Sequence, residues 1–330
     1  MTSSPTLGVI VTAFDRRTYF AQAVESVLGA DVGPNFTEYL LVRNFEDAVV
    51  DPELVKRGVR IVPDTSPDVG GTLYCALDHC DAEYLAFVDD DDLVLSHRWK
   101  RFEEIRALVP DLTYYHNAYE MFSDPASVTP SRSGNVSARA APSGRPWSRW
   151  RVADGEPFLR FLADKSWERN ISSTIVHRRV LERARDELSA IPAMSDTATL
   201  IAAITSPGSL VFDHEVTTRV RRHQRNVSKT TRNTRQRDLS LDLFARLVAR
   251  SSGADVARDY LELRRAREAV YNCTFGRARS PAELRAAMRI LQRYWKRLRR
   301  WRDIGFIGLG AVALAAPAAL PALRPLLVPR

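Results

Sequence analysis

The sequence predicts an α/β fold with a mostly parallel central sheet, helices on both faces, and a helical C-terminal extension that ends in a hydrophobic tail. Short apolar runs alternate with helical patterns through roughly the first hundred residues. Four aspartates follow the fourth apolar run directly, at the strand end where such sheets bind ligands. The chain has 330 residues, 45% hydrophobic and 27% charged, so the composition is globular and sufficient for one large domain or two ordinary ones.

The first half contains four apolar runs that suit buried strands. Continuous apolar strands of this kind are typical of parallel sheets that helices cover on both faces. The runs are Leu7–Thr12, Tyr39–Val42, Val59–Val62 and Tyr84–Val88.

The segments between these runs carry helix signals. A single apolar face, a Pro at the first helical position and a Gly at the end mark where helices begin and end. The expected helices are residues 16–30 with Gly29 as the stop, 51–58 with Asp51 as N-cap, 72–80, and 96–111 with Ser96 as N-cap.

The second half predicts further elements around one long loop. Residues 123–149 are rich in Ser, Pro, Gly and Arg, which predicts a flexible loop that is either disordered or a lid. The other expected elements are a strand at 112–122, a strand and helix at 173–188, a helix at 195–204, strands at 209–212 and 216–223, and helix over 236–272.

The positive charge is concentrated in one segment. The net charge is +8, and residues 277–302 contain ten Lys or Arg and one Glu, a balance of +9 that leaves −1 for the remainder. This distribution argues against a nucleic-acid-binding domain face. Three cysteines do not form a disulfide or metal pattern, and the N-terminus lacks the basic start of a signal peptide, so we expect reduced thiols in the cytoplasm.

The C-terminus predicts association with a membrane. Residues 280–303 read as a basic amphipathic helix with tryptophans, which suits an anionic headgroup surface. Residues 304–330 form a hydrophobic tail, uncharged to Leu323 and about long enough to span a bilayer, although its prolines favour a re-entrant segment. We therefore expect residues 280–327 to contact the cytoplasmic face of the cell membrane. The alternative is an ordinary amphipathic helix followed by a buried apolar hairpin.

The aspartates Asp89–Asp92 are the strongest chemical signal. Carboxylates at the carboxyl end of a buried strand can hold a hard divalent cation through oxygen, and such a cation neutralises a diphosphate. The alternative is a solvated acidic turn that precedes a helix.

Several motifs occur in a consistent order. They are "LGVIVTAFDRRTYFAQAVESVL", "EYLAFVDDDDLVLSHRWKRF", "MSDTATLIAAI" and "TRVRRHQRNVS". Over residues 6–228 the chain resembles glycosyltransferase family 2, the inverting nucleotide-sugar enzymes of the GT-A fold. "YYHNAYE" and "NISSTIVHRRVL" resemble mainly archaeal members. The resemblance implies a catalytic domain at 1–228, with a nucleotide-binding half at 1–110 and an acceptor half at 111–228, and then a helical extension at 229–279.

The resemblance also implies roles for individual residues. Asp196 would be the general base. Asp89, Asp91 and His223 would bind Mn²⁺ or Mg²⁺, with Asp90 and Asp92 as alternative ligands. The donor nucleotide would contact Thr12, Phe14, Asp15, Arg16, Asn44, Asp64, Asp89 and Asp90. The acceptor would meet His116, Asn117 and Trp167.

Each of these residues has a structural alternative. Asp196 could only cap its helix, His223 could lie on the surface, His116 could sit in a half-buried strand, and Trp167 could be core. The sequence also departs from the family, because Arg43 and Asn44 stand where an acidic motif is usual, and Ser195 replaces a Glu before Asp196.

These observations predict a metal-dependent inverting glycosyltransferase that acts on a membrane-linked acceptor, either a polyprenyl or other lipid or a glycan. One alternative is a catalytically inactive binding protein of the same fold that is recruited to membranes. A sugar nucleotidyltransferase is disfavoured because "VTAFDRR" lacks the glycine-rich phosphate loop of that class.

Overall fold

The computed structural model describes residues 5–14, 17–30, 37–123, 146–164, 170–223, 232–274 and 280–298, together with 307, 308, 310 and 311. Most of the predicted loop at 123–149 and of the predicted tail at 304–330 lies outside these residues. The chain divides into two compact units. The first contains residues 1–151 and 167–250, and the second contains residues 152–166 and 251–330.

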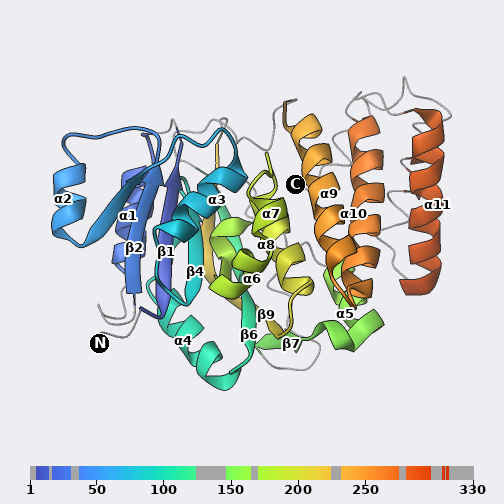
Figure 1. Ribbon diagram of the computed structural model, residues 1–330, viewed down its shortest axis with the longest axis horizontal. Helices are drawn as coiled ribbons and strands as arrows, with labels where there is room; N and C mark the ends of the chain where they lie inside the picture. Colours follow the sequence, from blue (N-terminus) through green and yellow to red (C-terminus); the bar gives the residue numbers. More distant parts are fainter. Residues whose placement is uncertain are drawn as a thin grey trace. The chain divides into compact units, whose positions relative to one another are not determined.

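The first unit is built on one sheet, which has nine strands in the described part of the chain. The strand order is β3-β2-β1-β4-β8-β6-β9-β5, with β7 paired to β9. Figure 1 shows β2, β1 and β4 in this order. The strands are β1 (Leu7–Ala13), β2 (Thr37–Arg43), β3 (Val59–Pro63), β4 (Tyr84–Asp89), β5 (Leu93–Val94), β6 (Leu112–Ser123), β7 (Trp147–Trp150), β8 (Thr174–His177) and β9 (Ser209–Arg222).

The sheet is mixed, as only its first part follows the parallel prediction. Strands β3, β2, β1 and β4 are parallel, whereas β8 runs antiparallel to both β4 and β6. The two late strands expected at 209–212 and 216–223 form the single strand β9, which pairs in parallel with β6. The polar residues between them do not end the strand, because the Asp213 carboxylate is fully buried and accepts hydrogen bonds from Arg101 and Tyr115.

Helices cover this sheet, with bounds close to those expected. In the first unit they are α1 (Phe20–Leu28), α2 (Asp51–Lys56), α3 (Val69–Asp78), α4 (Arg98–Leu108), α6 (Arg178–Arg183), α7 (Arg185–Leu188), α8 (Ser195–Ile204) and α9 (Arg232–Arg250). Gly29 follows α1 as predicted.

Two predicted N-caps are wrong. The cap positions of α2 and α4 are Val50 and His97, and neither makes a side-chain capping bond. The Asp51 carboxylate instead pairs with Arg43 and accepts the Asp47 N–H. The local pattern predicts that the Asp51 carboxylate caps α2, but the carboxylate binds the buried guanidinium of Arg43 instead.

The core of the first unit lies between the sheet and two helices. Val9 and Val11 of β1 pack in one cluster with Phe20 of α1 and with Trp99 and Phe102 of α4. All are at most 2% exposed. The buried β1 and β4 hold the strand ends, and with them the aspartates, in fixed positions.

The second unit is helical. It contains α5 (Gly155–Asp164), α10 (Asp255–Thr274) and α11 (Pro281–Leu298), and Figure 1 shows α10 and α11 side by side. The helix expected over 236–272 is broken near Gly253, which has a φ of 68°. The break separates α9 from α10, and the boundary between the units falls after residue 250, later than the expected 228/229.

Helix α11 begins with the capping box that its sequence suggests. The Ser280 N–H donates to Glu283 at 2.9 Å, and the Glu283 N–H donates to the Ser280 hydroxyl at 3.2 Å. Its apolar side is buried within the unit, where the Tyr294 hydroxyl donates toward Asp259 and Glu262 of α10. Among the described residues, no helix combines the length and apolar character that crossing a bilayer requires.

Candidate active site

The predicted acidic site begins where β4 ends. Thr12 of β1 and Asp89 of β4 lie opposite each other in the parallel register. The chain then turns, with the Asp92 N–H donating to the Asp89 carbonyl at 3.1 Å. The Asp89 N–H donates to the Ser172 hydroxyl at 2.9 Å, which ties the start of this turn to the segment before β8.

The aspartates are buried and partly convergent. Asp90, Asp91 and Asp92 are 1%, 6% and 2% exposed, so the turn is not the solvated acidic turn of the alternative interpretation. Asp89, Asp91 and Asp92 each offer a carboxylate oxygen within 4.8 Å of the others. Mutual repulsion at this spacing must be offset by nearby positive charge.

The end of β9 supplies part of that charge. The Arg221 N–H donates to Asp92 Oδ1, and its guanidinium Nε donates to the Asp91 carbonyl, both at 3.0 Å. The guanidinium also lies over the rings of Tyr19 and Phe122, at 4.3 and 4.6 Å from their centroids. His223 Nε2 lies 2.8 Å from Asp91 Oδ2. The end of β9 thus meets the acidic turn, although the two lie more than a hundred residues apart in the chain.

A second cation lies inside the fold. Arg98 is fully buried over the Trp99 ring, and within the described residues its guanidinium nitrogens have no hydrogen-bond partner. Burial lowers the pKa of Arg98 to about 10, while Tyr115 and Asp92 oppose that shift. The group therefore stays charged at neutral pH and contributes to neutralising the acidic turn.

The donor residues predicted at the other strand ends share one edge of the sheet. Phe14, Asn44 and Asp64 are the residues that directly follow β1, β2 and β3. Asp64 is 3% exposed, and its Oδ2 has no hydrogen-bond partner among the described residues, which leaves a buried acceptor at this edge. Arg43 does not join them, because it is buried beside Phe20 and Phe45 and pairs with Asp51.

Asp196 lies in the first turn of α8. Its Oδ1 accepts the N–H of the next residue, Thr197, at 2.6 Å, and the residue at the cap position is Met194. The Asp196 carboxylate is half-buried, whereas the helix behind it is buried from Thr197 to Ile204. The cap alternative for Asp196 therefore does not describe the chain, since the residue stands inside the helix.

The residues expected to meet an acceptor have different surroundings. His116 and Asn117 of β6 are 1% and 0% exposed. Burial, with the Arg98 charge, lowers the pKa of His116 to about 3, so the ring is neutral at pH 7. We leave both out of the proposed acceptor site because they are buried in the sheet. Asp15, Arg16 and Trp167 lie outside the described residues.

The side chains present fit a hard divalent cation. Asp89, Asp91 and Asp92 offer carboxylate oxygens, which Mg²⁺ and Mn²⁺ prefer, and His223 adds an imidazole nitrogen of the kind that Mn²⁺ also accepts. Asp92 joins this cluster, whereas Asp90 does not.

Sequence reasoning missed three residues of this site. Arg221, Arg98 and Ser172 all lie in the motifs of this sequence, but the motifs alone give none of them a role. The only local signal was the Arg221–His223 pair at the end of a strand. No local pattern predicts a role for Arg98. It begins α4, and its burial depends on how that helix packs in the fold.

Comparison with known proteins supports the class of enzyme. Residues 8–106 match the family described as glycosyl transferase family 2, a span that includes β1 to β4, the acidic turn and most of α4. This match, together with the solved structures below, supports the prediction that the chain is a glycosyltransferase. No curated protein matches the chain.

Solved structures show the same fold. The S. aureus TarS 1-349 structure with UDP-GlcNAc is 11% identical, covers 97% of this chain and 92% of its own, and has a TM-score of 0.63. The same fragment with UDP is 11% identical, with coverage of 98% and 93% and a TM-score of 0.60. A longer TarS structure is 12% identical, with coverage of 94% and 53% and a TM-score of 0.55. The α/β GT-A fold is thus confirmed, and nothing in these comparisons supports the likeness to archaeal members.

Proposed function

We propose that this chain transfers a sugar from a uridine diphosphate sugar to an acceptor hydroxyl, with inversion at the anomeric carbon. One observation carries the proposal. The carboxylates of Asp89, Asp91 and Asp92 converge at the carboxyl end of β4, within the segment that matches the family, and His223 Nε2 lies against Asp91. The similar TarS structures hold UDP-GlcNAc or UDP, which supports uridine diphosphate as the donor's leaving group.

The proposed reaction needs a base on one side of the sugar and positive charge on the other. The acceptor oxygen forms a bond to the anomeric carbon as the bond from that carbon to the diphosphate oxygen breaks. Asp196 takes the proton of the acceptor hydroxyl. The diphosphate leaves with the electron pair of the broken bond, on the side of Asp89 and Asp91. Inversion follows because attack and departure occur on opposite faces.

We propose that Asp89, Asp91 and His223 hold Mn²⁺ or Mg²⁺, with Asp92 as a further ligand. The bound ion would supply Lewis-acid stabilisation of the diphosphate charge. Arg221 fixes the backbone of Asp91, and Ser172 fixes that of Asp89, so the ligand carboxylates start from the same turn. We propose that the buried Asp64 Oδ2 accepts a hydrogen bond from the N–H of the donor's uracil.

Ligand-linked stabilisation tests this proposal. UDP and Mn²⁺ together are expected to raise the midpoint of thermal unfolding by about 5–10 °C at about 100 times the dissociation constant, since such binding contributes about 2.7 kcal/mol. UDP alone and Mn²⁺ alone are expected to give smaller shifts. ADP with Mn²⁺ is the control for recognition of the nucleotide's uracil. The same midpoint with and without UDP, in the presence of Mn²⁺, would contradict the proposal.

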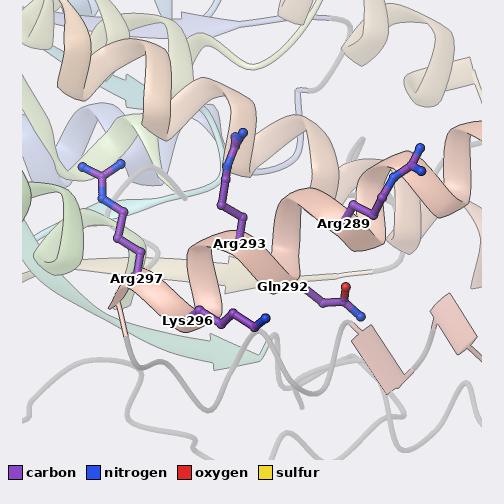
Figure 2. A pocket seen from close by; sticks show the side chains of 5 residues that line it. All are labelled: Arg289, Gln292, Arg293, Lys296 and Arg297. Atoms are coloured by element: carbon purple, nitrogen blue, oxygen red, sulfur yellow. The ribbon is translucent and has the colours of Figure 1, made fainter.

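We also propose that α11 places the enzyme at an anionic membrane surface by charge. Leu284, Leu291 and Leu298 of α11 are buried against its own unit, so the charged side of the helix is the side that we propose to meet the bilayer. Its other side lines an open hollow of about 570 Å³ (Figure 2). The lining residues are Arg289, Gln292, Arg293, Lys296 and Arg297, and Figure 2 shows all five projecting from this helix. The hollow lies in the second unit, whereas the acidic turn lies in the first.

Not all of that charge is available. Arg293 pairs with Glu262, and Arg297 pairs with Glu156 and Asp259. Arg289 and Lys296 have no such pairing in the described residues, so they are the best positioned to meet lipid phosphates. A membrane location favours an acceptor that is itself membrane-linked, as a lipid or a glycan precursor.

Charge reversal at Arg289 and Lys296 tests the location. The double variant Arg289→Glu/Lys296→Glu is expected to bind phosphatidylglycerol-containing vesicles about 10-fold or more weakly, since each basic residue near the surface contributes about 1 kcal/mol. Lys56→Glu/Lys100→Glu in the first unit changes the net charge equally and should retain binding. Equal vesicle binding by both double variants, or tighter wild-type binding to RNA at matched salt, would contradict the proposal.

A further inference from the structure

The segment before Asp196 contains an unusual backbone conformation. Met194 has φ 67° and ψ 44°, the left-handed region, and is the single non-glycine residue with positive φ in the described part of the chain. For an L-residue this conformation costs about 1–2 kcal/mol, so the surrounding structure must impose it. Met194 immediately precedes Ser195 and Asp196, and its carbonyl accepts the N–H of Ala198 at 2.8 Å as the first bond of α8.

One buried hydroxyl holds the residue before Met194. The Ser240 hydroxyl, on α9, accepts the Ala193 N–H at 3.2 Å. It lies 2.8 Å from the Ala193 carbonyl oxygen and 3.0 Å from the Gln236 carbonyl oxygen, and it can donate its proton to either. Ser240 is 0% exposed. Because the hydroxyl lies against both the N–H and the carbonyl oxygen of Ala193, it restrains the direction in which the chain enters Met194.

The other end of the segment is held by α3. The Gly70 N–H donates to the Ile191 carbonyl at 2.9 Å. A Cβ at Gly70 would lie 2.3 Å from the Leu188 carbonyl oxygen, so only glycine permits this approach. Residues 188–193 are therefore held by α3 at one end and by α9 at the other. The strained Met194 follows this segment and directly precedes α8.

We propose that Ser240 is a positioning residue for the reaction, which acts through the left-handed Met194 to fix the carboxylate of Asp196. This inference rests on the proposed function, in which Asp196 is the general base. Ser240 is buried in the fold, and among the described residues its hydrogen bonds go to Ala193 and Gln236 and none to the acidic turn, so we expect its effect on the base and not on the donor. The strain at Met194 is maintained because α8 must begin in one defined direction.

UDP release from UDP-GlcNAc with Mn²⁺ and water as acceptor measures this effect. Ser240→Ala is expected to lower kcat about 10–100-fold, since small misplacement of a reacting group costs up to about 10²-fold, and to leave UDP affinity unchanged. Ser206→Ala is the matched control. It removes a buried hydroxyl that donates to Ala202 at the far end of α8 and is expected to retain kcat.

Met194→Gly provides a second, independent variant. Glycine adopts the left-handed region without strain but does not hold it, so the thermal midpoint should stay near that of the wild type while kcat falls. An unchanged kcat in both Ser240→Ala and Met194→Gly overturns the proposal. A loss of UDP affinity in Ser240→Ala that equals its loss of kcat also overturns it, because the effect would then be general.

A double-mutant cycle separates this proposal from the one on which it rests. In the Asp196→Asn background, Ser240→Ala is expected to cause no further loss, because it acts through Asp196, and additive losses overturn that assignment. If Asp196→Asn releases UDP at the wild-type rate, Asp196 is not the general base, and the positioning role of Ser240 is wrong as well. If Asp196→Asn lowers the rate of UDP release and Ser240→Ala does not, only the positioning role of Ser240 is wrong.

Discussion

Asp196→Asn is expected to lower the rate of sugar transfer by about 10²–10⁴-fold, the usual contribution of a general base. Asparagine retains an oxygen that accepts the Thr197 N–H, which Asp196 Oδ1 does at 2.6 Å, so the start of α8 is preserved. It cannot take the proton that the proposed mechanism transfers from the acceptor hydroxyl to Asp196. The measurement is kcat for UDP release from UDP-GlcNAc, together with UDP affinity, which is expected to stay the same.

Asp186→Asn is the matched control for that variant. Asp186 is an acidic residue of α7 with an exposed side chain, and the same change of carboxylate to amide there should retain activity. Wild-type turnover in Asp196→Asn would contradict the enzyme mechanism and favour the alternative in which the fold serves only for binding. A loss of UDP affinity as large as the loss of rate would point to misfolding of α8.

Asp91→Asn is expected to weaken Mn²⁺ binding by about 100-fold or more. Replacing a residue that only hydrogen-bonds to a metal ligand already lowers metal affinity by about 10–100-fold, and Asp91 is proposed as a ligand itself. UDP with Mn²⁺ should then no longer raise the thermal midpoint as in the wild type. The ligand-free variant should remain folded, and its midpoint should be equal or higher, because one charge of a mutually repelling cluster has been removed.

Asp90→Asn is the comparison within the same turn. The Asp90 carboxylate is not one of the three that converge, so this variant should still require Mn²⁺ for its response to UDP. If Asp91→Asn retains the full Mn²⁺-dependent shift, or if Asp90→Asn alone abolishes it, the assignment of ligands is wrong. Isothermal titration of Mn²⁺ in the presence of UDP gives the affinities directly.

Much of the first unit could be predicted from the sequence. The four apolar runs became β1 to β4, since strands buried on both faces leave a continuous apolar signature. The positions of Asp89, Asn44 and Asp64 at strand ends followed from the same pattern. Errors occurred where local signals competed with tertiary contacts. Asp51 binds Arg43 instead of capping α2, and the polar residues around Asp213 lie inside a continuous strand.

The sequence by itself determined the four apolar strands, the acidic turn at the end of β4 and the class of chemistry, because each depends on residues that are near one another in the chain. Only the tertiary structure decided how the acidic turn is stabilised. Arg221 and His223 lie more than a hundred residues from the carboxylates they meet, and Arg98, whose charge acts on Asp92, is fully buried at the start of α4. Charge interactions depend on distance in space, and no local pattern records that distance.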